Sequence, residues 1–137
     1  MKRWITWLLA LIYVLGLSAC SNQNLTFEIA DASALRIQSG LTNEEVTVTD
    51  DASIRKITDD ICTLRFEKTA SADGSDAYIY LLTWLDAAGK QIAGITITEE
   101  NGYQIRHDGN YYKVGADLCI DIGLIDEVFN NASSASN

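Results

Sequence analysis

Five short segments between residues 63 and 114 carry strand signals, and clusters of turn-forming residues separate them. The segments are 63–69, 77–85, 91–98, 103–107 and 111–114, and the separators include SADGSD (71–76), DAAGK (86–90) and NG (101–102). Alternation with period two is typical of strands, and Asn-Gly tolerates the positive φ of a type I′ hairpin turn. Because links this short join neighbouring antiparallel strands, the pattern predicts an antiparallel β-meander.

A hairpin is predicted before the meander. Residues 34–38 and 45–49 alternate in the same way, and the turn residues SGLTN occupy positions 39–43 between them. Two such runs around a short turn are typical of a β-hairpin.

A helix is predicted between the hairpin and the meander. Asp50 or Thr49 can cap its N-terminus, and Asp51 in its first turn suits the helix dipole. One face of a 3.6-residue repeat then carries Ile54, Ile57, Ile61 and Leu64. Alternation resumes at Leu64, so we expect the helix to end near Cys62.

A second helix is predicted at the end of the chain. Asp121 can cap it, and its apolar residues are Leu124, Ile125, Val128 and Phe129. Residues 131–137, NASSASN, are expected to be disordered. The predicted fold is therefore α+β, a curved antiparallel sheet in the order ββαββββ(β)α, with the first helix on one face and a short C-terminal helix, and one domain over residues 34–130.

The strand expected at 77–85 is apolar on both sides. Ile79, Leu81 and Leu85 form an aliphatic side, which we assign to the helix. We assign the opposite face to the aromatic side, made of Tyr78, Tyr80, Leu82 and Trp84, with Arg106, Lys90, Arg65 and Thr96 beside it. Exposed aromatic patches often mark interfaces, so Tyr78, Tyr80, Trp84 and Arg106 are a candidate interaction surface. The alternative is that the last helix or the hairpin covers this face.

The first nineteen residues have the layout of a secretory signal. A basic head, Met1 to Arg3, precedes an uncharged apolar run from Trp4 to Leu17, too short for a comfortable transmembrane helix of about 20 residues. The run ends in Leu17-Ser18-Ala19-Cys20, which resembles a bacterial lipobox. The resemblance implies diacylglycerol transfer to the Cys20 thiol and cleavage after Ala19. An uncleaved anchor and a non-lipidated secretory peptide are the alternatives.

The lipobox resemblance also implies where the protein resides. A diacylglyceryl group supplies the two acyl chains that stable attachment requires. We therefore expect a membrane-anchored protein on the outer face of the bacterial cytoplasmic membrane, or in the outer membrane of a Gram-negative source. Residues 20–33 are polar and mixed, and we interpret them as a tether.

Removal of the signal makes the chain more acidic. Two of the ten basic residues and none of the nineteen acidic residues lie in residues 1–19, so the formal charge falls from −9 to −11. That charge argues against nucleic acid as a partner, and a cationic partner or simple solubility is favoured.

Cys62 and Cys119 remain after removal of the signal. In an oxidising compartment they are a candidate disulfide that would close a long loop and stabilise the fold by roughly 4 kcal/mol. The favoured interpretation is two buried free thiols that act as small apolar side chains.

Catalytic signatures are sparse. His107 is the only histidine, in a strand that ends at a turn, and a structural role is favoured. The paired acids at 50–51, 59–60 and 99–100 are sequence neighbours that do not face each other. Asp73 and Asp76 form a weak calcium candidate without the usual ligand pattern. We therefore expect no enzyme, no cofactor and no metal site.

The domain also resembles small uncharacterised lipoproteins of clostridial gut bacteria. The resemblance lies in EVTVTDDASIRKITDDI, YIYLLTWLDAAGKQIAGITI, GNYYKV and IDIGLIDEVF. It implies an exported, non-enzymatic domain. The leading hypothesis is a binding module for a small ligand or another envelope protein, and the alternative is an envelope sensor or inhibitor that acts on a neighbouring membrane protein.

Overall fold

The computed structural model describes residues 24–69, 77–98, 104–115 and 119–136. Its elements are β1 Asn24–Leu25, β2 Ala34–Ser39, β3 Glu45–Val48, α2 Asp51–Thr63, β4 Phe66–Thr69, β5 Tyr80–Leu85, β6 Gln91–Thr98, β7 Gln104–His107, β8 Asn110–Val114 and α3 Ile122–Ala135. The strands form one antiparallel sheet of eight strands in the order β1-β4-β8-β7-β6-β5-β2-β3. The predicted α+β fold with a curved antiparallel sheet is confirmed.

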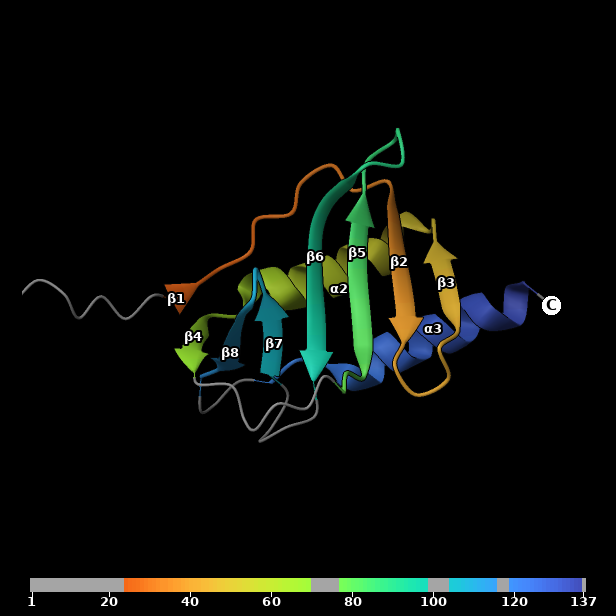
Figure 1. Ribbon diagram of the computed structural model, residues 1–137. Coiled ribbons are helices and arrows are strands. Elements are labelled where there is room, and N and C mark those ends of the chain that lie inside the picture. The colour runs from red at the N-terminus through yellow and green to blue at the C-terminus, as the bar shows by residue number, and fades with distance from the viewer. Residues whose placement is uncertain (1–23, 70–76, 99–103, 116–118, 137) are drawn as a thin grey trace, which may run out of the picture.

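Both helices lie on the same face of the sheet, behind it in Figure 1. Each helix buries one apolar stripe: Ile54, Ile57 and Ile61 from α2, and Ile125, Val128 and Phe129 from α3. These side chains pack with the buried residues of the sheet into one hydrophobic core. The core therefore lies on one side of the sheet, between it and the helices.

Aspartates cap both helices, as the sequence predicts. Asp50 accepts a hydrogen bond from the backbone amide of Ser53 at 2.9 Å. Hydrogen bonds from the Ser53 side chain and backbone lower the pKa of the Asp50 carboxyl. Asp121 caps α3 in the same way, through the amide of Leu124 at 3.0 Å.

The predicted meander is correct for β5 to β8 and wrong for β4. β4 pairs with β8, and three strands separate it from β5. β5 pairs instead with β2 over six residues, and this register places Leu35 beside Trp84 and Ile37 beside Leu82, all fully buried. The pairing places the apolar side of β2 next to the apolar side of β5. The order of the strands along the sequence does not predict this pairing, because β2 and β5 are not consecutive strands.

The predicted tether at 20–33 is also wrong over its described part. β1 pairs with β4 at the edge of the sheet, and Phe27 is only 7% exposed. The Phe27 ring lies edge-on to the rings of Phe66 and His107, with centroids 5.6 and 5.1 Å away. Because these contacts bury an aromatic ring, residues 24–33 belong to the domain.

The C-terminal residues 131–135 are helical, and the disorder predicted for this part of 131–137 is wrong. Ala132 packs against the core, and the Ser133 hydroxyl donates a hydrogen bond to the Glu44 carboxylate. The Ser134 hydroxyl donates to the carbonyl of Asn130 at 2.8 Å. Contacts with the core and with the β2–β3 hairpin thus extend α3 through Asn131, Ser133 and Ser134, whose helix propensity is low.

Candidate functional site

The predicted aromatic surface lies inside the protein. Tyr80 and Trp84 project from β5 toward the helices and belong to the core, and Trp84 is fully buried. Tyr78, just before β5, is half-buried. The prediction that Tyr80 and Trp84 form a contact surface with Arg106 is therefore wrong, as is the assignment of the aliphatic side of this strand to the first helix. The alternative that the last helix covers the aromatic face is correct for Tyr80, whereas α2 covers Trp84.

A hydrogen bond across the two layers satisfies the buried Trp84 indole. Its Nε1 donates to the Thr58 hydroxyl of α2 at 2.9 Å. The same hydroxyl donates to the backbone carbonyl of Ile54 at 2.7 Å. Because a buried N–H without a partner is costly, this pair specifies how α2 sits on β5.

Tyr80 links the sheet to the other helix. Its hydroxyl donates to the Asp126 carboxylate of α3 at 2.5 Å, and its ring packs against Phe129 at 5.8 Å between centroids. Burial, followed by the hydrogen bond and the negative charge of Asp126, raises the pKa of the Tyr80 phenol well above its ordinary value.

The opposite face of the sheet, which we call the open face, faces the viewer in Figure 1. The strand register sets its side chains in rows across the sheet. The longest row runs across the sheet from β3 to β4 through Glu45, Gln38, Leu81, Thr96, Arg106, Tyr111 and Thr69. Of the four residues predicted to form the contact surface, Arg106 lies in this row. Of the residues predicted beside them, Thr96 lies in the same row, whereas Lys90 lies in the β5–β6 turn and Arg65 precedes β4.

The open face is hollowed over β5, β6 and β7. The hollow has a volume of about 540 Å³, and its lining includes Leu81, Thr83, Ile92, Gly94, Thr96 and Arg106. The Gln91 side chain, which also lines the hollow, lies over Gly94, since a Cβ there would be 2.7 Å from the Gln91 amide nitrogen. Ile92 is one of two large apolar side chains that are exposed in the described part of the chain.

His107 borders the hollow and is half-buried. Its Nδ1 lies 3.1 Å from the backbone carbonyl of Gly94, and its Nε2 lies 3.3 Å from the Asp108 carboxylate. The ring also packs edge-on against Phe27. These contacts hold the His107 ring between the N-terminal segment and β6.

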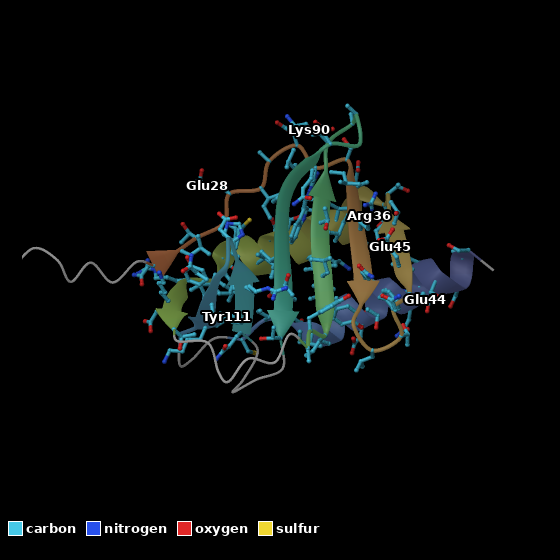
Figure 2. The ribbon with its side chains drawn as sticks, in the orientation of Figure 1. Glu28, Arg36, Glu44, Glu45, Lys90 and Tyr111 are labelled. Carbon is cyan, nitrogen blue, oxygen red and sulfur yellow. The ribbon has the colours of Figure 1, made fainter. Side chains whose placement is uncertain are left out.

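An ion pair lies on the other half of the open face. Arg36 Nε of β2 is 3.4 Å from the Glu45 carboxylate of β3, and both side chains are about half exposed at 44% and 49%. Figure 2 shows Arg36 and Glu45 on neighbouring strands, with Tyr111 on β8 across the sheet.

The two faces of the molecule differ in charge. Seven acidic residues and two basic residues lie in the helices or cap them: Asp50, Asp51, Asp59, Asp60, Asp121, Asp126 and Glu127, with Arg55 and Lys56. The open face carries three basic residues, Arg36, Arg106 and Lys113, and two acidic residues, Glu45 and Glu67. Glu45 lies in the row of Arg106, and Glu67 pairs with Lys113. The basic side chains are thus concentrated on the sheet relative to the acidic helices.

The two described cysteines are free thiols. Cys62, in the last turn of α2, is half-buried and packs against the core. Cys119 is exposed. The favoured prediction of two buried thiols is therefore wrong for Cys119.

Several sequence predictions fall outside the described residues, including the lipidation site Cys20 and the calcium candidate at Asp73 and Asp76. Within the described ranges, no three His, Cys, Asp or Glu side chains gather into a group that could hold a metal ion. Neither of the two described helices is long and apolar enough to span a membrane.

Comparisons with known proteins leave the chain without an assigned family. No family model, curated protein or solved structure matches it.

Proposed function

We propose that the protein is a lipid-anchored, extracytoplasmic binding module without catalytic activity, and that the open face of its sheet is the contact surface. The observation that carries this proposal is the hollow of about 540 Å³ around Arg106, on the side of the sheet opposite the helices. The surface differs from the one predicted from sequence, because the aromatic side chains of β5 are buried.

The open face is tested by site-specific photo-crosslinking in native membranes. A photoreactive residue replaces Thr83 or Thr96 on the open face, and matched variants carry it at Arg55 or Lys56, which are exposed on α2. We expect position-specific adducts from Thr83 and Thr96. Equal adduct formation from the α2 positions would contradict the open face as the contact surface.

The lipid anchor is supported by the sequence LSAC, and the position of β1 limits the distance between the anchor and the domain. β1 begins at Asn24, four residues after Cys20. Four extended residues reach about 14 Å. On this proposal the β1 edge of the sheet lies close to the bilayer, and β3 lies farthest away, since eight strands about 4.8 Å apart span roughly 35 Å.

Replacement of Cys20 tests the anchor. We expect Cys20→Ala to abolish both the mass of the diacylglyceryl group, measured on the intact protein, and recovery with the membrane fraction. Cys119→Ala removes an exposed thiol elsewhere in the chain and serves as the matched control, with acylation unchanged. If Cys20→Ala retained the mass of the diacylglyceryl group and the membrane recovery of the wild type, the proposed anchor would be overturned.

The short reach from the bilayer favours a second candidate, an envelope sensor or inhibitor that acts on a neighbouring membrane protein. A short connection raises the effective concentration of a partner in the same membrane. Insertion of a flexible segment after Ser21 should then reduce the yield of crosslinks to such a partner. An unchanged yield would argue against this candidate while leaving the open face as a binding surface.

A further inference from the structure

We propose that the outer edge of β3 is a second binding site, which takes an extended, positively charged segment of another protein as an added strand of the sheet. This edge lies at the end of the sheet, away from the hollow over β5, β6 and β7. The inference goes beyond the proposed function, because it does not require the open face to bind a partner.

The outer edge of β3 presents backbone groups without partners. β3 is the last strand of the sheet, and β2 is its neighbour on one side only. The Ser39 amide donates to the Glu44 carbonyl at 2.9 Å, which fixes the residues of β3 that bond to β2. Because bonding alternates along an antiparallel ladder, the N–H and C=O groups of Glu45 and Thr47 point away from β2. No other segment within the described ranges bonds to these groups.

β3 also lacks the features that usually protect an edge strand. Such strands commonly carry lysine or proline, or a bulge that interrupts the pairing. β3 has the sequence EVTV and pairs with β2 in an unbroken register. Valine and threonine favour the extended conformation of a strand. An edge of this kind suits β-augmentation, in which an extended peptide adds a strand through backbone hydrogen bonds.

A groove beside this edge gives an added strand a surface to pack against. The groove has a volume of about 330 Å³, and β3, the start of α2 and the end of α3 line it. Figure 1 shows α3 passing behind β3 and continuing beyond it. Neighbouring strands lie about 4.8 Å apart, so an added strand would cover this end of α3. Its lining residues Ala132, Ala135 and Ser136 are small and leave room for apolar side chains of the partner.

The charge around the edge selects a cationic partner. Four exposed acidic residues flank β3, namely Glu44 and Glu45 at its start and Asp50 and Asp51 after its end. Two basic residues lie nearby, Arg36 beside Glu45 and Lys56 near Asp50. The acidic residues are therefore in excess. A second copy of the chain would bring the same four acids and a formal charge of −9, so like charges would oppose the pairing of two copies.

The two sides of the site predict the residue pattern of the partner. Antiparallel pairing, which the whole sheet uses, places the partner residues opposite Glu45 and Thr47 on the open face. A lysine or arginine there lies next to the Glu45 carboxylate. The residues between them face the groove, where an apolar side chain packs against α3. The partner segment therefore alternates basic and apolar residues.

Hydrogen exchange of the full chain in uncharged detergent micelles, followed by nuclear magnetic resonance, tests this proposal. The probe is the peptide KVKVKV with blocked termini. We expect saturable binding that slows exchange of the Glu45 and Thr47 amides at least tenfold and leaves the Val46 amide, which bonds to β2, unchanged. The peptide EVEVEV, and KVKVKV with N-methyl groups on its lysine amides, should not bind. Equal protection by EVEVEV would overturn the cationic partner, and equal protection by the methylated peptide would overturn strand addition.

Matched variants locate the site. Thr47→Pro removes an outward N–H at an edge position, where proline is tolerated, and should weaken peptide binding at least tenfold. Ala135→Trp fills the groove and should act similarly, whereas Ser134→Trp, outside the groove lining, should not. Glu45→Gln should weaken binding severalfold, and Glu67→Gln on β4 should leave it unchanged. Equal affinities within both matched pairs, with dispersed spectra that show the variants to be folded, would reject the β3 edge as the site.

A second copy of the chain is the other possible occupant. Protection of the Thr47 amide that rises with protein concentration, without any peptide, would show that two β3 edges pair and would overturn the cationic partner. Crosslinks from Thr83 and Thr96 report on the open face separately. Loss of the β3 site would therefore leave the proposed function standing, and loss of those crosslinks would leave the β3 site standing.

Discussion

The two faces of β5 show how neighbours decide the role of a residue. Leu82 and Trp84 point toward the helices and are fully buried, whereas Leu81 and Thr83 point to the open face and are half-buried. These residues alternate on the same strand and share its backbone geometry. The difference arises from the adjacent strands, because Ile95 opposes Leu82 on one face while Thr96 opposes Leu81 on the other. A strand that is apolar on both sides thus contributes one face to the core and the other to a solvated surface.

Among the variants that test this difference between the two faces, truncation of Trp84 should have the largest effect on the free energy of unfolding. Trp84→Ala removes a fully buried ring and leaves the Thr58 hydroxyl without its indole partner. We expect it to lower the free energy of unfolding by about 3–5 kcal/mol, measured by urea denaturation. Leu81→Ala, three positions away on the open face, should cost about 1 kcal/mol or less. Similar costs for the two variants would contradict the assignment of the faces.

Removal of the Tyr80 hydroxyl should have an intermediate effect. Tyr80→Phe keeps the ring against Phe129 but loses the hydrogen bond to Asp126, and should cost about 0.5–1.5 kcal/mol at neutral pH.

The raised pKa of Tyr80 adds a pH dependence to this prediction. Because the folded protein holds the phenol protonated, the stabilisation is complete below the unfolded pKa of about 10 and is lost as the pH rises above it. The advantage of the wild type over Tyr80→Phe should therefore shrink above about pH 10. Urea denaturation between pH 8 and pH 11 measures it, and an advantage that stays constant or grows would contradict the contact with Asp126.

The ion pair of the open face should have the smallest effect on stability. Arg36→Gln breaks the contact with Glu45, but both side chains are about half exposed, at 44% and 49%. Surface pairs of this kind contribute about 0.2–1 kcal/mol, and salt screens them. We expect a change within this range in low salt and almost none in high salt. A larger loss of unfolding free energy that does not depend on salt would show that this half of the open face is covered.

Most of the secondary structure can be predicted from the sequence, because local signals specify it. The spacing of Ile54, Ile57 and Ile61 and the cap at Asp50 place α2 correctly, and the hairpin of β2 and β3 follows from its turn residues. The end of α3 could not be predicted, since the Glu44 contact that extends it comes from a hairpin far away in the chain.

The candidate site was predicted on the wrong face of the right strand. Arg106 and Thr96 were identified together, but beside Tyr80 and Trp84 instead of Leu81 and Tyr111. A signal was available in the sequence. The hairpin around residues 86–90 pairs Tyr80 with Ile97 and Leu82 with Ile95, so the aromatic side of β5 shares a face with the isoleucines of β6.

The sequence by itself determined the elements from β2 onward, their order along the chain, the capping aspartates and the acidic balance, because these depend on residues close together or on composition alone. Only the tertiary structure decided that β4 pairs with β8, that Phe27 joins the core and that the aromatic rings of β5 face the helices. Those outcomes depend on which apolar surfaces meet when distant segments pack together. Burial of the larger aromatic side against the helices leaves Arg106 and the hollow on the open face.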